Sequence, residues 1–181
     1  YENGQLESEL NYIDGKWDGL RKLWYENGQL NHKYFYDGDT TTFREWYENG
    51  QLHSEYIYVD SLFFGRVWYK NGQLAYEGNS IDDKDDGLHK EWFENGQLKW
   101  EKNYKNGNEV GLQRFWYESG QLKSELKYKD GGKGGVEDGL QRNWYENGEL
   151  KTEYNYIDGI INGLQKRWYE NGQLKYEWNW K

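Results

Sequence analysis

Trp24-Tyr25-Glu26-Asn27-Gly28-Gln29-Leu30 is the stretch of sequence that decides the fold of this chain. The same heptapeptide recurs intact at Trp46–Leu52 and Trp168–Leu174. Near-copies with one substitution stand at Trp68–Leu74, Trp92–Leu98, Trp116–Leu122 and Trp144–Leu150, and a copy without its tryptophan stands at Tyr1–Leu6. The glycines of these copies recur every 22 to 28 residues. An internal period of this size predicts a repeat array.

An Asn-Gly pair between two apolar runs predicts a β-hairpin, and two registers are open. A two-residue Asn-Gly loop would place tyrosine opposite leucine. A three-residue Glu-Asn-Gly loop, with glycine in the left-handed bulge position, would place tryptophan opposite leucine. We predict the three-residue loop, because it alone places the alternating side chains of both strands on one face of the sheet. In one hairpin these are Leu112, Arg114 and Trp116 before the turn, and Leu122, Ser124, Leu126 and Tyr128 after it.

A second turn with Asp-Gly or Asn-Gly, such as Asp158-Gly159, joins one hairpin to the next, and most of the variation in repeat length lies there. The longest connection, Lys129–Gly139, is rich in glycine, and we expect it to be the most mobile point. The strand that begins at Leu74 leads into the acidic run Asp82–Asp86, and we expect it to end early. The predicted organisation is one array, 1–181, with a half repeat, 1–19, and hairpin repeats 20–41, 42–63, 64–87, 88–111, 112–139, 140–163 and 164–181.

Composition limits the class of protein. The chain has 181 residues, a net charge of −9, and neither cysteine nor methionine. Its 11 tryptophans and 18 tyrosines supply apolar area that the aliphatic residues do not, so we expect a folded chain with an aromatic core. The absence of cysteine excludes a disulfide framework and a thiolate metal site. The acidic balance argues against nucleic acid as a ligand, and no apolar run is long enough for membrane insertion.

No signal peptide is present, and the chain begins inside a repeat without an initiating methionine. We therefore expect a processed product or a trimmed fragment, which leaves both a cytoplasmic and an exported location open.

The repeated unit, Gly-Leu-x-x-x-Trp-Tyr-Glu-Asn-Gly-Gln-Leu-Lys-x-Glu-x-x-Tyr, resembles the bacterial MORN-repeat variant of YwqK-family, antitoxin-like proteins of toxin–antitoxin systems. The resemblance covers essentially the whole chain. It implies an all-β fold, an elongated and twisted antiparallel sheet of hairpins with meander topology, and no catalytic residues. Related MORN repeats in eukaryotes are associated with membrane tethering and protein scaffolding, but the acidic charge of this chain argues against phospholipid binding.

Equivalent positions of a repeat sheet stack into columns, and we looked for candidate sites as columns. The tryptophan column is predicted to form the core. Two residues before each tryptophan stands a base on the same predicted face. We favour a stem that lies on the next tryptophan ring as a cation–π pair over a basic stripe for an acidic partner. This basic column is Lys22, Arg44, Arg66, Lys90, Arg114, Arg142 and Lys166.

On the opposite predicted face, the residues after the tryptophans form an aromatic column, with Tyr1 as its first member: Tyr25, Tyr47, Tyr69, Phe93, Tyr117, Tyr145 and Tyr169. Beside it we expect a glutamate column, broken by Lys33: Glu9, Glu55, Glu77, Glu101, Glu125, Glu153 and Glu177. Two interpretations are open. The rings are either a candidate binding face for sugars or peptides, or a cross-strand ladder whose hydroxyls stay in water, and we favour the ladder. Tyrosine and glutamine are then the only part of the motif free to touch a partner.

No other residues form a site. His32, His53 and His89 lie in different repeats, with the first on the face opposite to the other two, so we expect no metal cluster. Asp82–Asp86 lacks the glycine and the closing glutamate of an EF-hand and is predicted to be a solvated loop. No phosphate loop or catalytic triad motif is present. Active sites are singular whereas this chain repeats every candidate, so we expect no enzyme activity and no cofactor.

These observations predict a non-catalytic binding or scaffolding module. A protein is the favoured partner, and neutralisation of that partner, as by an antitoxin, is included. The alternative is a secreted or cell-surface carbohydrate-binding or adhesive protein that uses the aromatic column. Open sheet edges at residues 6–12 and 174–180 would also allow end-to-end self-association.

Overall fold

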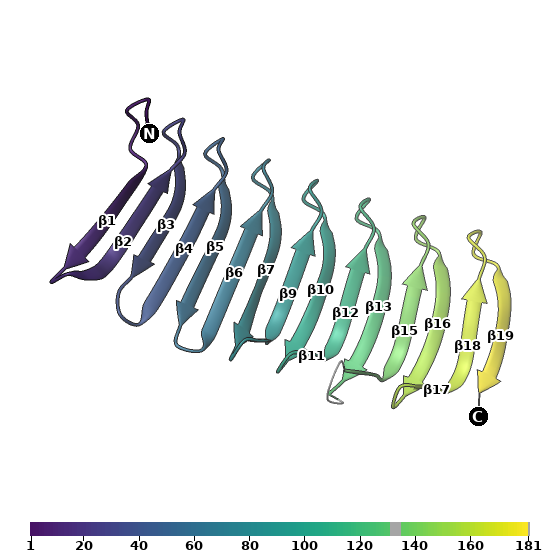
Figure 1. Cartoon of the computed structure of the whole chain (residues 1–181). Helices are drawn as coiled ribbons and strands as arrows, with labels where there is room; N and C mark the ends of the chain where they lie inside the picture. Colours follow the sequence, from purple (N-terminus) through teal and green to yellow (C-terminus); the bar gives the residue numbers. More distant parts are fainter. Residues whose placement is uncertain (131–134, 181) are drawn as a thin grey trace. The chain divides into compact units, whose positions relative to one another are not determined.

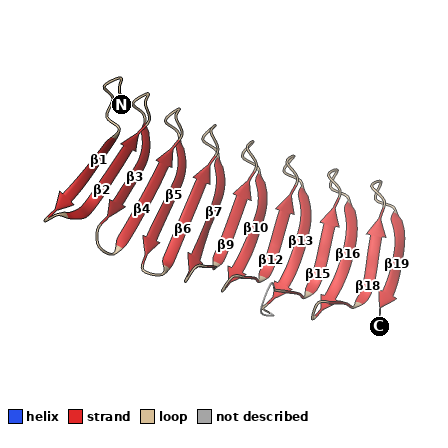
Figure 2. Ribbon diagram, in the orientation of Figure 1, coloured by secondary structure: helices blue, strands red, loops and turns tan. Residues whose placement is uncertain are grey.

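The structure is a computed structural model that describes residues 1–130 and 135–180, apart from the side chains of residues 13 and 16–18. Strands and turns make up the whole of this described part (Figures 1 and 2). The chain divides into two compact units, Tyr1–Asp83 and Lys84–Lys181. The all-β prediction of consecutive antiparallel hairpins is confirmed.

Unit 1 is an antiparallel meander in which each strand pairs with its neighbours in the sequence. Its strands are β1 Ser8–Ile13, β2 Lys16–Trp24, β3 Leu30–Tyr36, β4 Thr40–Trp46, β5 Leu52–Val59, β6 Leu62–Trp68 and β7 Leu74–Ile81. From β3 to β7 the ladders between hairpins run without interruption.

Unit 2 is also antiparallel, but a two-residue strand stands between one hairpin and the next. Its strands are β8 Lys84–Asp85, β9 Gly87–Trp92, β10 Leu98–Lys105, β11 Asn108–Glu109, β12 Gly111–Trp116, β13 Leu122–Lys129, β14 Val136–Glu137, β15 Gly139–Trp144, β16 Leu150–Ile157, β17 Ile160–Ile161, β18 Gly163–Trp168 and β19 Leu174–Trp180. Between β10 and β12, between β13 and β15, and between β16 and β18, the ladder is interrupted.

The turn of the heptapeptide has the predicted three-residue loop. In the first complete copy, the amide of Gly28 donates to the carbonyl of Tyr25 over 2.9 Å, and the amide of Tyr25 donates to the carbonyl of Gln29 over 2.8 Å. Gly28 has a φ of 83°, a left-handed conformation that favours glycine. Trp24 lies opposite Leu30, and the other six complete copies have the same register.

A second bulge follows each of these leucines and was not predicted. Trp116 pairs with Leu122, but the next pair is Phe115 with Ser124, so Lys123 is an extra residue in the second strand. An extra residue reverses the alternation beyond it. The predicted sharing of one face by both alternating sets is therefore wrong: Ser124, Leu126 and Tyr128 lie on the face opposite to Arg114. We call the side that carries the tryptophans the tryptophan face and the other side the reverse face.

The expected aromatic core is also wrong. All seven heptapeptide tryptophans are half-buried, because the described residues of each unit form a single sheet without a second layer to cover them. Within the described ranges, Ala75 is the only apolar residue in the buried class, at 9% exposure. The other buried residues of the described ranges are Gly65 and Gly78 and the polar residues Ser54, His89, Gln113, Gln141, Thr152 and Gln165.

Two expectations about connections have different outcomes. Strand β7 continues to Ile81 and is as long as β5, so the expectation that it ends early is wrong. Asp82 and Asp83 then turn the chain with φ values of 50° and 59°, a conformation that aspartate tolerates better than most residues. The expected mobility of Lys129–Gly139 falls on residues 131–134, which lie outside the described residues.

Candidate functional site

The basic column lies on the tryptophan face, as predicted, but the glutamate column lies there too. Arg44 donates from Nε to Oε1 of Glu55 over 2.6 Å, and Arg142 does the same to Oε2 of Glu153 over 2.8 Å. The predicted place of the glutamates beside the tyrosines is wrong, because the second bulge carries them to the other side. The remaining pairs are Lys22–Glu9 at 3.1 Å, Arg66–Glu77 at 3.4 Å, and Arg114 with Glu101 at 3.0 Å and Glu125 at 3.1 Å.

Each of these pairs is partly exposed, so it contributes at most about 1 kcal/mol. Their main effect is to give the bases carboxylate partners within the sheet. The expected stack on the following tryptophan is found for Lys22, whose Nζ lies 6.0 Å from the ring centre of Trp24. A basic stripe for an acidic partner stays a prediction, and its cations are already interleaved with carboxylates.

Lys33 breaks this alternation of charge. It lies directly between Lys22 on β2 and Arg44 on β4, so three cations are neighbours where glutamate would otherwise separate them. A cavity of about 240 Å³ lies beside it, lined by Lys33, Phe35, Thr42 and Arg44. Like charges in direct cross-strand register destabilise a sheet.

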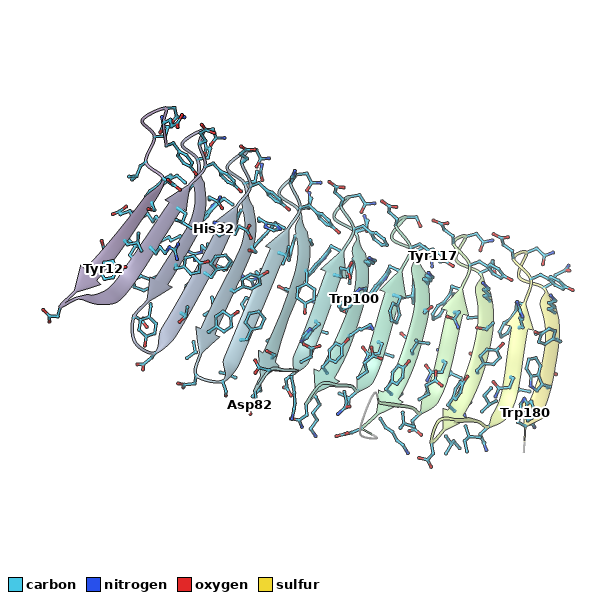
Figure 3. The ribbon with its side chains drawn as sticks, viewed as in Figure 1. Tyr12, His32, Asp82, Trp100, Tyr117 and Trp180 are labelled. Atoms are coloured by element: carbon cyan, nitrogen blue, oxygen red, sulfur yellow. The ribbon has the colours of Figure 1, made fainter. Side chains whose placement is uncertain are left out.

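Five tyrosines of the aromatic column each join one repeat to the next. Tyr25 donates its hydroxyl hydrogen to the backbone carbonyl of Trp46 over 2.8 Å. Figure 3 shows Tyr117 near the turn end of its hairpin, where its hydroxyl donates to the carbonyl of Trp144 over 2.9 Å. The expectation that the hydroxyls stay in water is wrong for the tyrosines that make this bond. The equivalent bonds are Tyr1 to Trp24, Tyr47 to Trp68, and Tyr145 to Trp168.

Burial raises the pKa of the Tyr25 hydroxyl, and the negative charges of Glu45 and Glu48 add to this effect. Burial likewise raises the pKa of Tyr117. Both effects keep the hydroxyl protonated, which is the form that donates the hydrogen bond.

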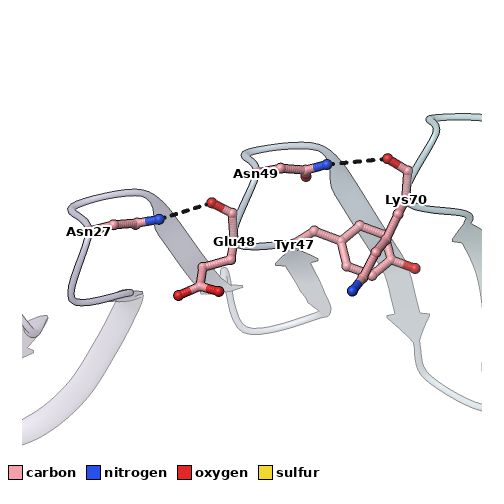
Figure 4. Close-up of a pocket in the computed structure, with 5 residues that line it drawn as sticks. All are labelled: Asn27, Tyr47, Glu48, Asn49 and Lys70. Atoms are coloured by element: carbon pink, nitrogen blue, oxygen red, sulfur yellow. Dashed lines mark hydrogen bonds between the residues drawn. The ribbon is translucent and has the colours of Figure 1, made fainter.

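The asparagine of the turn makes one hydrogen bond within its own turn and one to the next repeat. Asn27 accepts from the amide of Gln29 over 2.9 Å, and its Nδ2 donates to the carbonyl of Glu48 in the next repeat over 3.0 Å. Asn49 repeats the second contact with the carbonyl of Lys70 over 3.3 Å (Figure 4). The side chain holds its own turn closed and ties it to the following one.

The glutamine of the motif covers the glycine of the next turn. A Cβ atom added at Gly50 would lie 3.0 Å from Oε1 of Gln29, and one at Gly72 would lie 2.5 Å from Oε1 of Gln51. Tyrosine, asparagine and glutamine thus all contact the next repeat. The prediction that tyrosine is free to touch a partner is wrong where its hydroxyl donates to the next repeat. The glutamines lie against the next turn, but Gln29 and Gln51 are exposed, and their part of the prediction stays a prediction.

The extra residue of the second bulge covers the tyrosine ring, a role that the sequence reasoning missed. In unit 2 this residue is a lysine whose Nζ lies over the ring of the preceding turn: Lys99 over Phe93 at 5.8 Å, Lys123 over Tyr117 at 5.5 Å, Lys151 over Tyr145 at 5.3 Å and Lys175 over Tyr169 at 5.1 Å. In unit 1, the ring of His53 lies 4.5 Å from that of Tyr47. The recurring Leu-Lys was the available signal.

Buried glutamines bridge the interrupted ladders of unit 2, and sequence reasoning missed these as well. Oε1 of Gln113 accepts from the amide of Asn103 over 2.9 Å, and its Nε2 donates to the carbonyls of Asn103 and Val110 over 3.1 and 2.9 Å. Gln141 makes the same pair of bonds with Lys127. A primary amide can stand in for a backbone amide in this way, which satisfies groups that the gap would leave unpaired.

The reverse face of unit 1 carries rings in cross-strand contact. Phe43 and Tyr56 stack with centroids 5.7 Å apart and an interplanar angle of 2°, and Phe63 lies 5.6 Å from Tyr56. Gly65 makes room for them, since a Cβ there would lie 2.9 Å from the ring of Phe63. We call these rings the aromatic strip: Tyr34, Phe43, Tyr56, Tyr58 and Phe63. The predicted kind of ladder is therefore present, but on other residues.

Two of the histidines converge on one carboxylate, contrary to the prediction that they lie on opposite faces. Nε2 of His32 lies 3.5 Å from Oε1 of Glu45, and Nδ1 of His53 lies 3.0 Å from Oε2. His53 is the extra residue of its bulge, which lets it reach across. Among the residues that the structure describes, no group of three or more histidine, aspartate or glutamate side chains is placed to hold a metal ion.

Grooves lie between neighbouring turns. One of about 350 Å³ is lined by Asn27, Tyr47, Glu48, Asn49 and Lys70 (Figure 4). Another, of about 330 Å³, lies in unit 2 and is lined by Tyr117, Lys123, Ser124, Asn143, Trp144, Lys151, Thr152, Tyr154 and Arg167. No helix in the described ranges has the length and apolar character needed to cross a membrane.

The repeats match a known family model. The model described as MORN repeat variant matches residues 1–14, 17–37, 40–60, 65–82, 85–106, 109–130, 137–158 and 161–181. None of the curated proteins compared with the chain matches it. The narrower resemblance to YwqK-family proteins and a bacterial source remain predictions.

Proposed function

Because this chain belongs to the MORN repeat variant family, whose repeats generally bind proteins or membranes, we propose that it is a protein-interaction or scaffolding module. It has no catalytic activity of its own in this proposal. One observation carries it: the recurring tyrosine and asparagine side chains contact the next repeat, which leaves the broad faces of the sheet as the surface for a partner.

The exposure of those faces supports the proposal. In a single sheet, large side chains have nothing to cover them, and Tyr12 is 61% exposed and Tyr58 is 45% exposed on the reverse face of unit 1. Tyr58 belongs to the aromatic strip, whose rings contact one another across strands, and contiguous apolar surface of this kind is unusual on a protein that binds nothing. Tyrosine also suits an interface, because it offers a large apolar area and one polar end at low entropic cost.

Capture of a partner tests this proposal. The immobilised chain is exposed to a lysate of the organism that makes it, and retained proteins are cross-linked and identified by mass spectrometry. We expect one protein or a small set that is retained by the wild-type chain and released by the soluble chain in excess. If nothing is retained specifically, the proposal is wrong.

Neutralisation of a toxic partner is one form of this function, supported by the resemblance of the repeated unit to antitoxin-like proteins. Co-expression of the captured partner with and without this chain tests it. Growth arrest by the partner alone, and recovery with the chain, is the expected result. A partner that is harmless alone would contradict the antitoxin form and leave the binding function intact.

Carbohydrate binding is a second candidate, favoured by the aromatic strip. Flat rings held on neighbouring strands can stack on successive sugar rings, and the ring planes of Phe43 and Tyr56 are nearly parallel, with an angle of 2° between them. A glycan array probed with the wild-type chain and with Tyr56→Ser tests this candidate. Binding that the substitution removes would support it, and the absence of binding to any glycan would refute it.

A further inference from the structure

Although the chain carries a net charge of −9, the groove of about 330 Å³ in unit 2 is lined by three cations and by no acidic residue among those described. The cations are Lys123, Lys151 and Arg167. We propose that this groove, which we call the cationic groove, binds an extended acidic segment of a partner protein. The inference rests on the proposed protein-binding function and specifies the site and the chemistry of the partner.

The cations of the groove differ from the basic column in their neighbours. Residues of the basic column are interleaved with glutamates on the tryptophan face. In the described part of the chain, Lys123, Lys151 and Arg167 form no ion pair with a carboxylate. Lys99 shows the contrast, because it occupies the same bulge position and its Nζ lies 2.6 Å from Oε1 of Glu91. The position that Glu91 fills in its strand is taken by Asn143 and Arg167 in the strands of the groove.

Arg167 is held in place by one hydrogen bond and keeps an N–H donor that has no acceptor. Its Nη1 donates to the hydroxyl of Tyr176 over 3.1 Å, and its buried Nε has no hydrogen-bond partner. A buried guanidinium donor without an acceptor costs free energy. A carboxylate in the groove would supply the acceptor and would form the strong charge-assisted bond that arginine favours.

The floor of the groove is built from fixed polar groups. Ser124 donates to Oδ1 of Asn143 over 2.7 Å, and Nδ2 of Asn143 donates to the hydroxyl of Thr152 over 2.9 Å. Lys123 and Lys151 are positioned over the rings of Tyr117 and Tyr145 at 5.5 and 5.3 Å. Preorganised cations lose less side-chain entropy when they bind.

The spacing of the lysines favours an extended peptide. Lys123, Lys151 and Lys175 occupy equivalent positions on β13, β16 and β19, and one long strand, β15 or β18, separates each pair at the level of the lysines. Two strand spacings are roughly 9.5 Å. A peptide in the extended polyproline II conformation rises roughly 3.1 Å per residue with three residues per turn, so every third side chain points the same way and lies roughly 9.3 Å further on. Acidic residues at every third position of an extended segment would therefore meet successive lysines.

A membrane surface fits this place less well than a peptide does. Glu146 and Glu170 stand close enough to Tyr117 at the turn ends to contribute to its raised pKa. A broad anionic surface that approached the groove would meet these carboxylates as well. A single extended chain can follow the row of lysines and leave the turn ends in water.

A peptide-binding measurement tests the proposal. The probe is a fluorescein-labelled peptide of sequence Glu-Gly-Ser-Glu-Gly-Ser-Glu-Gly-Ser-Glu, and its anisotropy is followed on titration with the full chain at low ionic strength. A second peptide has the same composition with its glutamates contiguous. We expect the spaced peptide to bind about three times more tightly than the contiguous one, and both to weaken with salt.

Charge-matched variants locate the binding. Lys151→Gln/Arg167→Gln removes two charges inside the groove and is expected to weaken binding of the spaced peptide about tenfold. Lys99→Gln/Lys105→Gln removes two charges outside it and is expected to leave binding unchanged. Lys123→Gln changes an exposed side chain that cannot prevent folding, and about threefold weakening is expected. Thermal unfolding confirms that each variant is folded.

Three results would overturn the proposal. They are no binding of either peptide by the wild-type chain, equal loss in the two double variants, and groove-dependent binding of anionic phospholipid vesicles in place of the peptide. Partner capture separates this inference from the proposed function. If Lys151→Gln/Arg167→Gln retains the captured partner undiminished, the groove assignment is wrong and the binding function stands. If no chain retains any protein, the proposed function itself is wrong.

Discussion

The hydroxyl of Tyr25 lies 2.8 Å from the backbone carbonyl oxygen of Trp46, one repeat further along the chain, and donates a hydrogen bond to it. The heptapeptide thus specifies two things at once. Its Glu-Asn-Gly portion closes a hairpin, and its tyrosine and asparagine bond that hairpin to the next one, against which the glutamine lies.

Removal of this hydroxyl should weaken the array. Tyr25→Phe keeps the ring and leaves the Trp46 carbonyl without the bond, so we expect a loss of about 1 kcal/mol in the free energy of unfolding. Urea denaturation followed by tryptophan fluorescence measures it. Tyr58→Phe removes an exposed hydroxyl and serves as the control, with an expected change within about 0.5 kcal/mol. Equal effects of the two substitutions would contradict the role of the hydroxyl.

The raised tyrosine pKa values predict a loss of stability in alkali. Burial, followed by the charges of Glu109 and Asp85, raises the pKa of Tyr104 from 10.0 to about 12. Above pH 10 the unfolded chain releases protons that the folded chain retains, so stability is full below pH 10 and falls as the pH rises towards 12.

Urea denaturation across this range, combined with the ultraviolet absorbance of tyrosinate, measures the effect. In Tyr104→Phe the fall should be shallower. A free energy of unfolding that stays constant above pH 10 would show that the folded-state pKa values are not raised.

The buried glutamines should be costly to remove. Gln113→Ala leaves the amide and carbonyl of Asn103 without their partners, and we expect a loss of roughly 2–4 kcal/mol. Hydrogen exchange should accelerate at the Asn103 amide. Gln141→Ala is the matched control, because it should accelerate exchange at Lys127 and not at Asn103. Protection at Asn103 that survives Gln113→Ala would refute the bridge.

A methyl group at the turn glycine should be poorly tolerated for two separable reasons. Gly72 has a φ of 85°, and a Cβ there would lie 2.5 Å from Oε1 of Gln51. We expect Gly72→Ala to cost more than about 1 kcal/mol. In a Gln51→Ala background the steric part should disappear while the backbone part remains. If the two substitutions are additive, the glutamine does not cover the glycine.

The sequence was sufficient for the hairpins and their turns, because Asn-Gly flanked by alternating side chains has one well-favoured geometry. It was not sufficient for the faces of the sheet. The extra residue after each leucine, such as Lys123, carries no turn signal, yet it reverses the alternation beyond it. Glu125 was therefore placed on the wrong side and its ion pair with Arg114 was not foreseen.

Two features of the candidate site also could not be predicted from the sequence. Tyr117 was predicted to present its hydroxyl to solvent, but repeats pack closely enough for it to reach Trp144. Gln113 was not singled out, since polar residues are expected outside, and a single sheet with interrupted ladders needs amide groups inside. In the sequence, neither a bonded tyrosine nor a buried glutamine differs in its spacing from an exposed residue of the same type.

A stability and binding comparison of Tyr117→Phe/Tyr145→Phe with the wild-type chain tests the central claim most directly, because it separates attachment between repeats from partner binding. Both hydroxyls donate to the next repeat, at 2.9 and 3.0 Å. The account predicts a loss of about 2 kcal/mol in the free energy of unfolding with undiminished anisotropy of the acidic peptide. Unchanged stability together with lost peptide binding would contradict it.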